Sequence, residues 1–269
     1  MAILSIKDLE KHDGDIVLFP AFHLNVAKSE IIAIYSSLNV RKILLDLFIG
    51  KASTHHGEIL VNGQVFSKNK ATYLNQLGIL FFEDGLYDRL TVMSQFKFYQ
   101  GLYESNQTID QILKLTQLET QRHTKIRKLS HSEKTRVLFG KLLFQNPALF
   151  VLEEPDLNVD METKRIYINI VQKLQQEGKA ILVLTGNMEN AITVADQVYR
   201  LDEDGLQTII VETEDGQVVE EPESEVIHFN KIPTKVNGKI VLFDPPEIDY
   251  IESHDGQSNL YVKGEAFPL

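Results

Sequence analysis

The stretch IIAIYSSLNVRKILLDLFIG, residues 31–50, decides the fold class. Residues 31–35 form a continuous apolar run, which is typical of a β-strand buried on both faces. Residues 42–49 follow with the pattern of a helix. A buried strand that leads directly into a helix indicates an α/β protein.

The same alternation continues to about residue 200. Asn62-Gly63 stands between two apolar pairs and predicts a hairpin. A more helical region is expected at residues 91–118, so the α/β domain contains a helical insertion. The cap of the following helix is expected at Ser130 or Ser132. The expected strands are 148–152, 180–185 and 198–201, and the expected helices are 132–145, 160–176 and 188–195.

The composition changes after residue 211. Residues 212–225 are rich in acidic residues and predict an exposed linker or a weak edge hairpin, and we place the acidic linker at residues 212–230. Residues 231–269 have β periodicity, with Asn237-Gly238 as a second hairpin signal. We therefore expect an α/β domain over residues 1–211 and a small all-β segment that is cut short at residue 269.

Composition limits the classes of function. The chain has 269 residues, 27 Lys and Arg, 38 Asp and Glu and a net charge of -11, so its overall field does not favour nucleic acid. It has no cysteine, which excludes disulfides and thiolate zinc sites. It contains neither a membrane-length apolar run nor a signal-peptide pattern, so a cytoplasmic protein without a membrane span is expected.

Five segments in order resemble an ABC-type ATPase. The resemblance implies a P-loop nucleotide-binding fold for residues 1–211. It also implies a residual nucleotide site made by Lys42, Glu153 and His12, with Glu154 at the position of the catalytic base. The five segments are GEILVNGQ (57–64), DGLYDRLTV (84–92), KLSHSEKTRVLFGKLLFQNP (128–147), LFVLEEPDLNVD (149–160) and TGNMENAITVADQV (185–198).

The phosphate loop departs from the pattern G-x-x-x-x-G-K-[ST]. The equivalent residues 36–44 contain no glycine, and Ile43 replaces the hydroxyl that binds Mg²⁺. Phe82 replaces the family's glutamine, and Gly186 replaces its switch histidine. Other departures are His131 and Ser132 for the signature glycines, and Glu153 for an aspartate.

These departures predict that ATP hydrolysis is lost. No cofactor is required on this interpretation, ATP or ADP binds weakly and no magnesium is expected. Both remaining site residues also have structural interpretations: Lys42 as a solvated helix residue, and Glu154 as a hydrogen-bond acceptor at a strand end. No metal site is predicted, and the question whether the chain is an enzyme stays open.

Residues 231–269 resemble the start of a LytTR-type DNA-binding domain, through the hairpin at Asn237-Gly238, IDYIES (248–253) and LYVKG (260–264). The resemblance implies DNA contacts from a polar loop, since such side chains bind base edges or phosphates. The alternative is an ordinary hairpin turn with solvated side chains. The candidate DNA-binding residues are His254, Gln257, Ser258, Asn259 and Lys263.

The two resemblances together predict a transcription regulator. Its inactive ATPase-like domain would form a homodimer, and its complete C-terminal domain would bind DNA. The alternative is the ATP-binding subunit of an ABC transporter, and a third hypothesis is a protein-binding scaffold.

Overall fold

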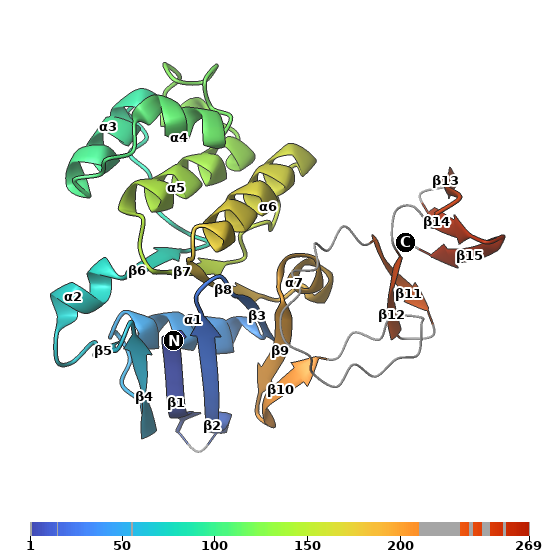
Figure 1. Cartoon of the computed structure of the whole chain (residues 1–269), viewed down its shortest axis with the longest axis horizontal. Coiled ribbons are helices and arrows are strands. Elements are labelled where there is room, and N and C mark those ends of the chain that lie inside the picture. The colour runs from blue at the N-terminus through green and yellow to red at the C-terminus, as the bar shows by residue number, and fades with distance from the viewer. Residues whose placement is uncertain are drawn as a thin grey trace.

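We describe the protein from a computed structural model. The structure describes residues 2–14, 16–54, 56–209, 232–236, 239–243, 248–254 and 257–268. Up to residue 209 the chain forms two sheets with helices packed against them (Figure 1).

A six-stranded sheet with the order β10-β9-β3-β8-β7-β6 forms the centre of this part. β3 lies between β8 and β9 and runs parallel to both, and β7 runs parallel to β8 and β6. All residues of β7 and β8 are buried, as expected for strands covered on both faces. The strands are β3 (Ile31–Ser36), β6 (Leu77–Leu80), β7 (Leu149–Glu153), β8 (Ala180–Thr185), β9 (Gln197–Asp202) and β10 (Gly205–Ile209).

An antiparallel sheet with the order β2-β1-β4-β5 covers one face of the central sheet, and α1 packs in the shared core. The predicted hairpin at Asn62-Gly63 is confirmed, with φ values of 48° and 76°. β1 and β2 are two strands that the sequence analysis does not predict, although residues 22–26 of β2 alternate between buried and exposed. The strands are β1 (Ala2–Asp13), β2 (Ile16–Ala27), β4 (His56–Val61) and β5 (Gln64–Val65).

Helices cover the opposite face and enclose a second core (Figure 1). The predicted helical insertion is confirmed as α3 and α4. α5 begins with the predicted cap Ser130, which forms a reciprocal pair of hydrogen bonds with Glu133. These helices are α3 (Val92–Leu102), α4 (Ile109–Leu115), α5 (His131–Gln145), α6 (Met161–Gln176) and α7 (Met188–Val194), whereas α2 (Lys70–Asn75) packs in the first core through Tyr73.

α1 (Leu38–Phe48) begins four positions earlier than residue 42, where the sequence places its start. Ser37 caps the helix and accepts a hydrogen bond from the Val40 N–H at 3.4 Å. No residue between 36 and 48 has a positive φ. Without glycine, right-handed helical backbone costs less than the left-handed turns of a wide loop. An extra helical turn therefore replaces that loop.

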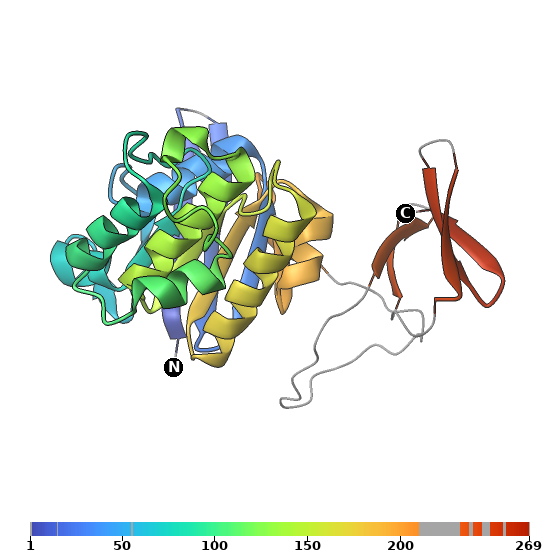
Figure 2. The ribbon, with the colours of Figure 1, turned by 90° about the horizontal axis from the view of Figure 1, so that it is seen from above.

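In the C-terminal segment, every regular element among the described residues is a strand, as predicted (Figure 2). Phe243, Leu260 and Val262 form its small core. The predicted turns at 237–238 and 255–256, and the predicted linker 212–230, lie outside the described residues. The boundaries 1–211, 212–230 and 231–269 therefore stay a prediction. The strands are β11 (Ile232–Val236), β12 (Lys239–Phe243), β13 (Tyr250–His254), β14 (Gln257–Val262) and β15 (Glu265–Pro268).

Candidate functional site

The carboxyl ends of β3, β7 and β8 meet at one edge of the central sheet, because the three strands are parallel neighbours. This edge is the usual place for ligands in α/β proteins. Three buried polar residues end these strands, namely Ser36, Glu153 and Thr185. Glu154 follows β7 directly, so the sheet places the predicted base position at this edge.

Glu154 is held by two hydrogen bonds and one ion pair. Its Oε1 accepts from the Gly186 N–H at 2.8 Å and lies 2.9 Å from Nη2 of Arg41. Its Oε2 accepts from the Thr185 hydroxyl at 2.8 Å. The backbone φ of Glu154 is 43°, a conformation that is uncommon for a residue with a side chain. The surrounding contacts therefore determine both the backbone and the carboxylate of Glu154.

Arg41 provides the positive charge opposite Glu154, and both side chains are 8% exposed. A second guanidinium nitrogen, Nη1, donates to the carbonyl oxygen of Ser36. Two buried polar atoms beside these contacts have no hydrogen-bond partner, Nε of Arg41 and Oγ of Ser36. The guanidinium thus spans the ends of β3 and β7 and keeps an unused donor.

Gly186 leaves room for this arrangement. A Cβ at Gly186 would lie 2.9 Å from Nη1 of Arg41 and 3.2 Å from Oε1 of Glu154. Both distances are shorter than ordinary van der Waals contacts. Gly186 stands at the family's histidine position, and Arg41 stands at the second glycine position of its phosphate loop. The two replacements depend on each other, because a side chain at residue 186 would collide with the Arg41 guanidinium.

Lys42 is exposed on the first turns of α1, and Ser37, Leu38 and Asn39 beside it are also exposed. The first N–H groups of a helix lack acceptors within the helix and attract anions. An accessible helix start with a lysine one turn further on suits a phosphate group. The first turn of α1 is closed, however, and does not form a cradle around a phosphate chain.

The other two predicted nucleotide residues, Glu153 and His12, lie in different parts of the structure. Glu153 is buried at the end of β7, and its Oε2 accepts from the Phe82 N–H at 3.0 Å. His12 belongs to the antiparallel sheet, where its ring pairs with Glu10 at 2.5 Å. The structure therefore brings Glu153 and Glu154 together, with Lys42 on the neighbouring helix, and assigns His12 a contact within its own strand.

The residues that replace family motifs have structural contacts. Phe82 packs edge-on against the His131 ring at 6.4 Å, and both line a hollow that also contains Glu153 and Glu154. Ser132 is buried and its hydroxyl accepts from the Asp160 N–H at 2.9 Å. Ser132 therefore joins α5 to the segment before α6, and its hydroxyl does not point to solvent.

Arg136 strengthens the same connection. Its Nε donates to the Thr163 hydroxyl at 2.7 Å, and its Nη2 donates to Glu162 at 2.6 Å. The Thr163 N–H donates to Asp160 and lowers the pKa of that carboxyl to about 2. The start of α6 is thus fixed to α5 by a polar network that the sequence analysis missed.

The candidate DNA-binding residues are described incompletely. Ser258 and Asn259 are half-buried in β14, and Lys263 is exposed with a φ of 50°. The side chains of His254 and Gln257 lie outside the described ones.

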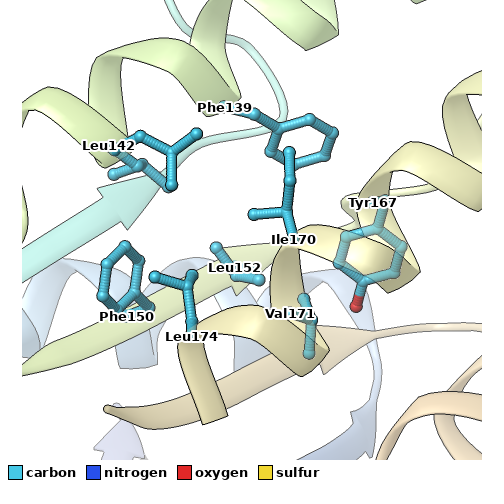
Figure 3. Close-up of a pocket in the computed structure, with 9 residues that line it drawn as sticks. Phe139, Leu142, Phe150, Leu152, Tyr167, Ile170, Val171 and Leu174 are labelled. Carbon is cyan, nitrogen blue, oxygen red and sulfur yellow. The ribbon is translucent and has the colours of Figure 1, made fainter. Parts of the chain in front are cut away.

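A void between α5, α6 and β7 lies away from the sheet edge (Figure 3). Its lining is apolar, and the hydroxyl of Tyr167 is the one oxygen among the side chains drawn. The void is part of the packed core and does not provide groups for binding a polar ligand. Its lining residues are Phe139, Leu142, Leu143, Phe150, Leu152, Tyr167, Ile170, Val171 and Leu174.

Comparisons with known proteins find similarity to ATP-binding proteins of ABC transporters. The ABC transporter family model matches residues 42–157. The chain is 22% identical over 214 residues to the spermidine/putrescine import ATP-binding protein PotA of Bacillus cereus, covering 77% of this chain and 65% of PotA. It is 28% identical over 232 residues to a putative ABC transporter ATP-binding protein of Methanosarcina acetivorans, covering 81% of this chain and 41% of the relative.

A solved structure of an ATP-binding subunit of an ABC transporter superimposes with a TM-score of 0.68. It is 19% identical and the match covers 76% of this chain and 88% of that one. The predicted fold class is therefore confirmed: this is the mixed α/β P-loop fold of ABC ATPases. The findings support an ABC transporter-type ATP-binding domain, and they do not support the LytTR-type part of the resemblance.

The predicted transcription regulator is therefore wrong. The relatives are ABC transporter ATP-binding proteins, and this supports the alternative function. The predicted DNA partner is wrong for the same reason, because the relatives are transporter subunits that partner with membrane components. The error arose because short β-hairpin patterns recur in unrelated sheets, whereas five ordered segments specify one fold. Among the described residues, no helix is long and apolar enough to cross a membrane.

The prediction that no cofactor and no magnesium are needed is also contradicted, because ABC ATPases bind ATP with Mg²⁺. That prediction gave too much weight to the missing hydroxyl at Ile43. Magnesium is usually bound through one or two carboxylates, substrate phosphates and waters. Lys42 and the exposed start of α1 suit the phosphates, and Glu153 offers a carboxylate at the same edge of the sheet.

Proposed function

We propose that this chain is the ATP-binding subunit of an ABC transporter and works on the cytoplasmic side of a membrane. The observation that carries the proposal is the ABC ATPase fold, with an exposed Lys42 at the start of α1 beside the ends of β3 and β7. The chain spans 65% and 41% of the two relatives named above, so the transported substrate and the membrane partner stay outside this proposal.

The residues of the proposed nucleotide site have distinct roles. Lys42 and the first N–H groups of α1 bind phosphate oxygens, because both are positive donors at an accessible surface. Glu153 provides an oxygen ligand for the magnesium ion that accompanies the phosphates, and the ion neutralises their charge. Glu154 stands at the position of the base, and His12 stacks on the adenine ring.

Titration calorimetry with ATP tests the proposal. The wild-type chain is expected to bind ATP with Mg²⁺, and Lys42→Ala is expected to weaken binding about tenfold, as for one charged phosphate contact. Lys97→Ala, which removes an exposed lysine on α3, is the matched control and leaves the affinity unchanged. Absence of binding at millimolar ATP would refute the proposed function.

Hydrolysis is a separate prediction. The sequence departs from the family at several positions that act in the transition state, and each lost contact of that kind costs about 10²–10³ in rate. We therefore expect phosphate release well below that of ABC ATPases with an intact loop. Measurement of phosphate release by the purified chain, with Glu154→Gln as the blank, checks this expectation.

A further inference from the structure

Arg41 and Glu154 form a buried ion pair, and both residues lie at the proposed nucleotide site, which would bind an anion. The nearest atoms are 2.9 Å apart and each side chain is 8% exposed. Arg41 occupies the position of the last loop glycine, so its guanidinium enters space that a glycine would leave empty. Arg41 directly precedes Lys42 in the sequence, and both residues belong to the first turns of α1.

The contact leaves hydrogen-bonding capacity unused. A guanidinium has five N–H donors in a planar fork. Nη1 donates to Ser36 and Nη2 contacts Glu154, whereas the buried Nε has no partner. The buried hydroxyl of Ser36 also lacks a partner. Oγ of Ser36 and Nε of Arg41 are thus buried without a partner at the two ends of the segment 36–41. Both atoms can donate a hydrogen bond, which indicates that a further acceptor completes the site.

A phosphate group is the acceptor with the matching chemistry. Arginine binds phosphate through two parallel N–H···O bonds, and these charge-assisted bonds are stronger than neutral ones. A dianionic phosphate at the start of α1 therefore competes with the single negative charge of Glu154 for the same guanidinium.

We propose that Arg41 is a phosphate-sensing positioning residue that forms a latch with Glu154. In the ligand-free chain Arg41 holds the Glu154 carboxylate, and on nucleotide binding it exchanges Glu154 for a phosphate oxygen. Glu154 is released in this way when the site is filled. The proposal rests on the nucleotide binding proposed above, and it deepens that function by naming the residue that couples binding to Glu154.

Gly186 makes the latch possible and offers a way to disturb it without changing a charge. A methyl group at this position would lie 2.9 Å from Nη1 of Arg41 and 3.2 Å from Oε1 of Glu154. The φ of Gly186 is outside the positive region, so alanine fits the backbone. Gly186→Ala therefore disfavours the latched arrangement through contact alone.

The test is a thermodynamic cycle in ATP affinity, measured by calorimetry on the full chain with Mg²⁺. The variants are Arg41→Gln, Glu154→Gln and the double variant. The latch predicts that Glu154→Gln tightens ATP binding about fivefold or more, a typical coupling between linked sites. In a chain that already carries Arg41→Gln, Glu154→Gln is expected to alter the ATP affinity by less than about twofold, because Glu154 and the phosphate no longer compete for a guanidinium.

Gly186→Ala provides the second arm and keeps both charged groups. It is expected to tighten ATP binding several-fold, while Gly101→Ala, where a Cβ meets nothing within 4 Å, leaves the affinity unchanged. If the Arg41–Glu154 pair has only a structural role, these variants lower stability and their ATP affinity stays within about twofold of the wild type. That result overturns the latch. A wild-type chain that binds no ATP overturns the proposed function instead, so the two failures are distinguishable.

Discussion

The buried ion pair between Arg41 and Glu154 is expected to contribute to the free energy of unfolding of the nucleotide-free chain. Arg41→Met keeps an apolar chain of similar length and removes the positive charge. Glu154 is then a buried carboxylate that has lost its ion-pair partner and keeps two hydrogen-bond donors. Removing one partner of a buried ion pair costs about 3–5 kcal/mol, because the other charge stays desolvated and unpaired.

The lower end of this range applies, since Gly186 and Thr185 still donate to the carboxylate. A loss of about 3 kcal/mol corresponds to a fall in Tm of about 6–12 °C for a domain of this size. Scanning calorimetry or a dye-based thermal scan measures the shift. Arg41→Met/Glu154→Gln is expected to recover most of it, because the double variant has no unpaired charge.

An exposed ion pair of the same length serves as the control. Arg122 lies 2.9 Å from Asp110, with side chains that are 37% and 80% exposed. Such surface pairs contribute about 0–1 kcal/mol, so Arg122→Met is expected to lower Tm by less than about 4 °C. If Arg41→Met and Arg122→Met lower Tm equally, the pair at the sheet edge is not a desolvated ion pair and the reasoning fails.

Three further changes test other contacts by thermal unfolding. The fold lowers the pKa of Asp160 to about 2, so its charge stabilises the fold above about pH 4, and this contribution is lost as the pH falls from about 4 to about 2. Asp160→Asn, which still caps α6, should show a smaller loss of Tm across that window than the wild type; equal losses would exclude this role. Gly140→Ala places a Cβ 2.6 Å from the Phe96 ring and should cost about 1–3 kcal/mol by overpacking, whereas Gly101→Ala in open space should be neutral or stabilising. Ser130→Ala removes the cap of α5 and should cost about 1 kcal/mol, and an unchanged Tm would mean that the cap contributes nothing.

The sequence alone was sufficient for the elements that local patterns specify. The apolar runs of β3, β7 and β8 and the caps and periodicity of α5 and α6 depend on neighbours along the chain, and they were predicted within a few residues. The order of five segments then gave the fold class. β1 and β2 were missed although residues 22–26 of β2 alternate strictly between buried and exposed; the register shifts along the pair lie outside what a local pattern shows.

The sequence also exposed the lack of glycine between Ser36 and Lys42, but it did not show what replaces the loop. Tertiary structure decided that the first turn of α1 closes and that Arg41 reaches Glu154. The short C-terminal resemblance led to a wrong function, because a hairpin pattern carries little information about partners.

The difference has one physical origin. Hydrophobic periodicity, capping and turn chemistry act over a few residues, so the sequence determined the strands, the helices and their order. The contacts at the candidate site join the ends of three strands that are distant in the chain, and their geometry depends on the parallel register of the sheet. The side-chain direction of Arg41, the left-handed backbone of Glu154 and the space above Gly186 therefore follow from the packed structure and not from any one segment.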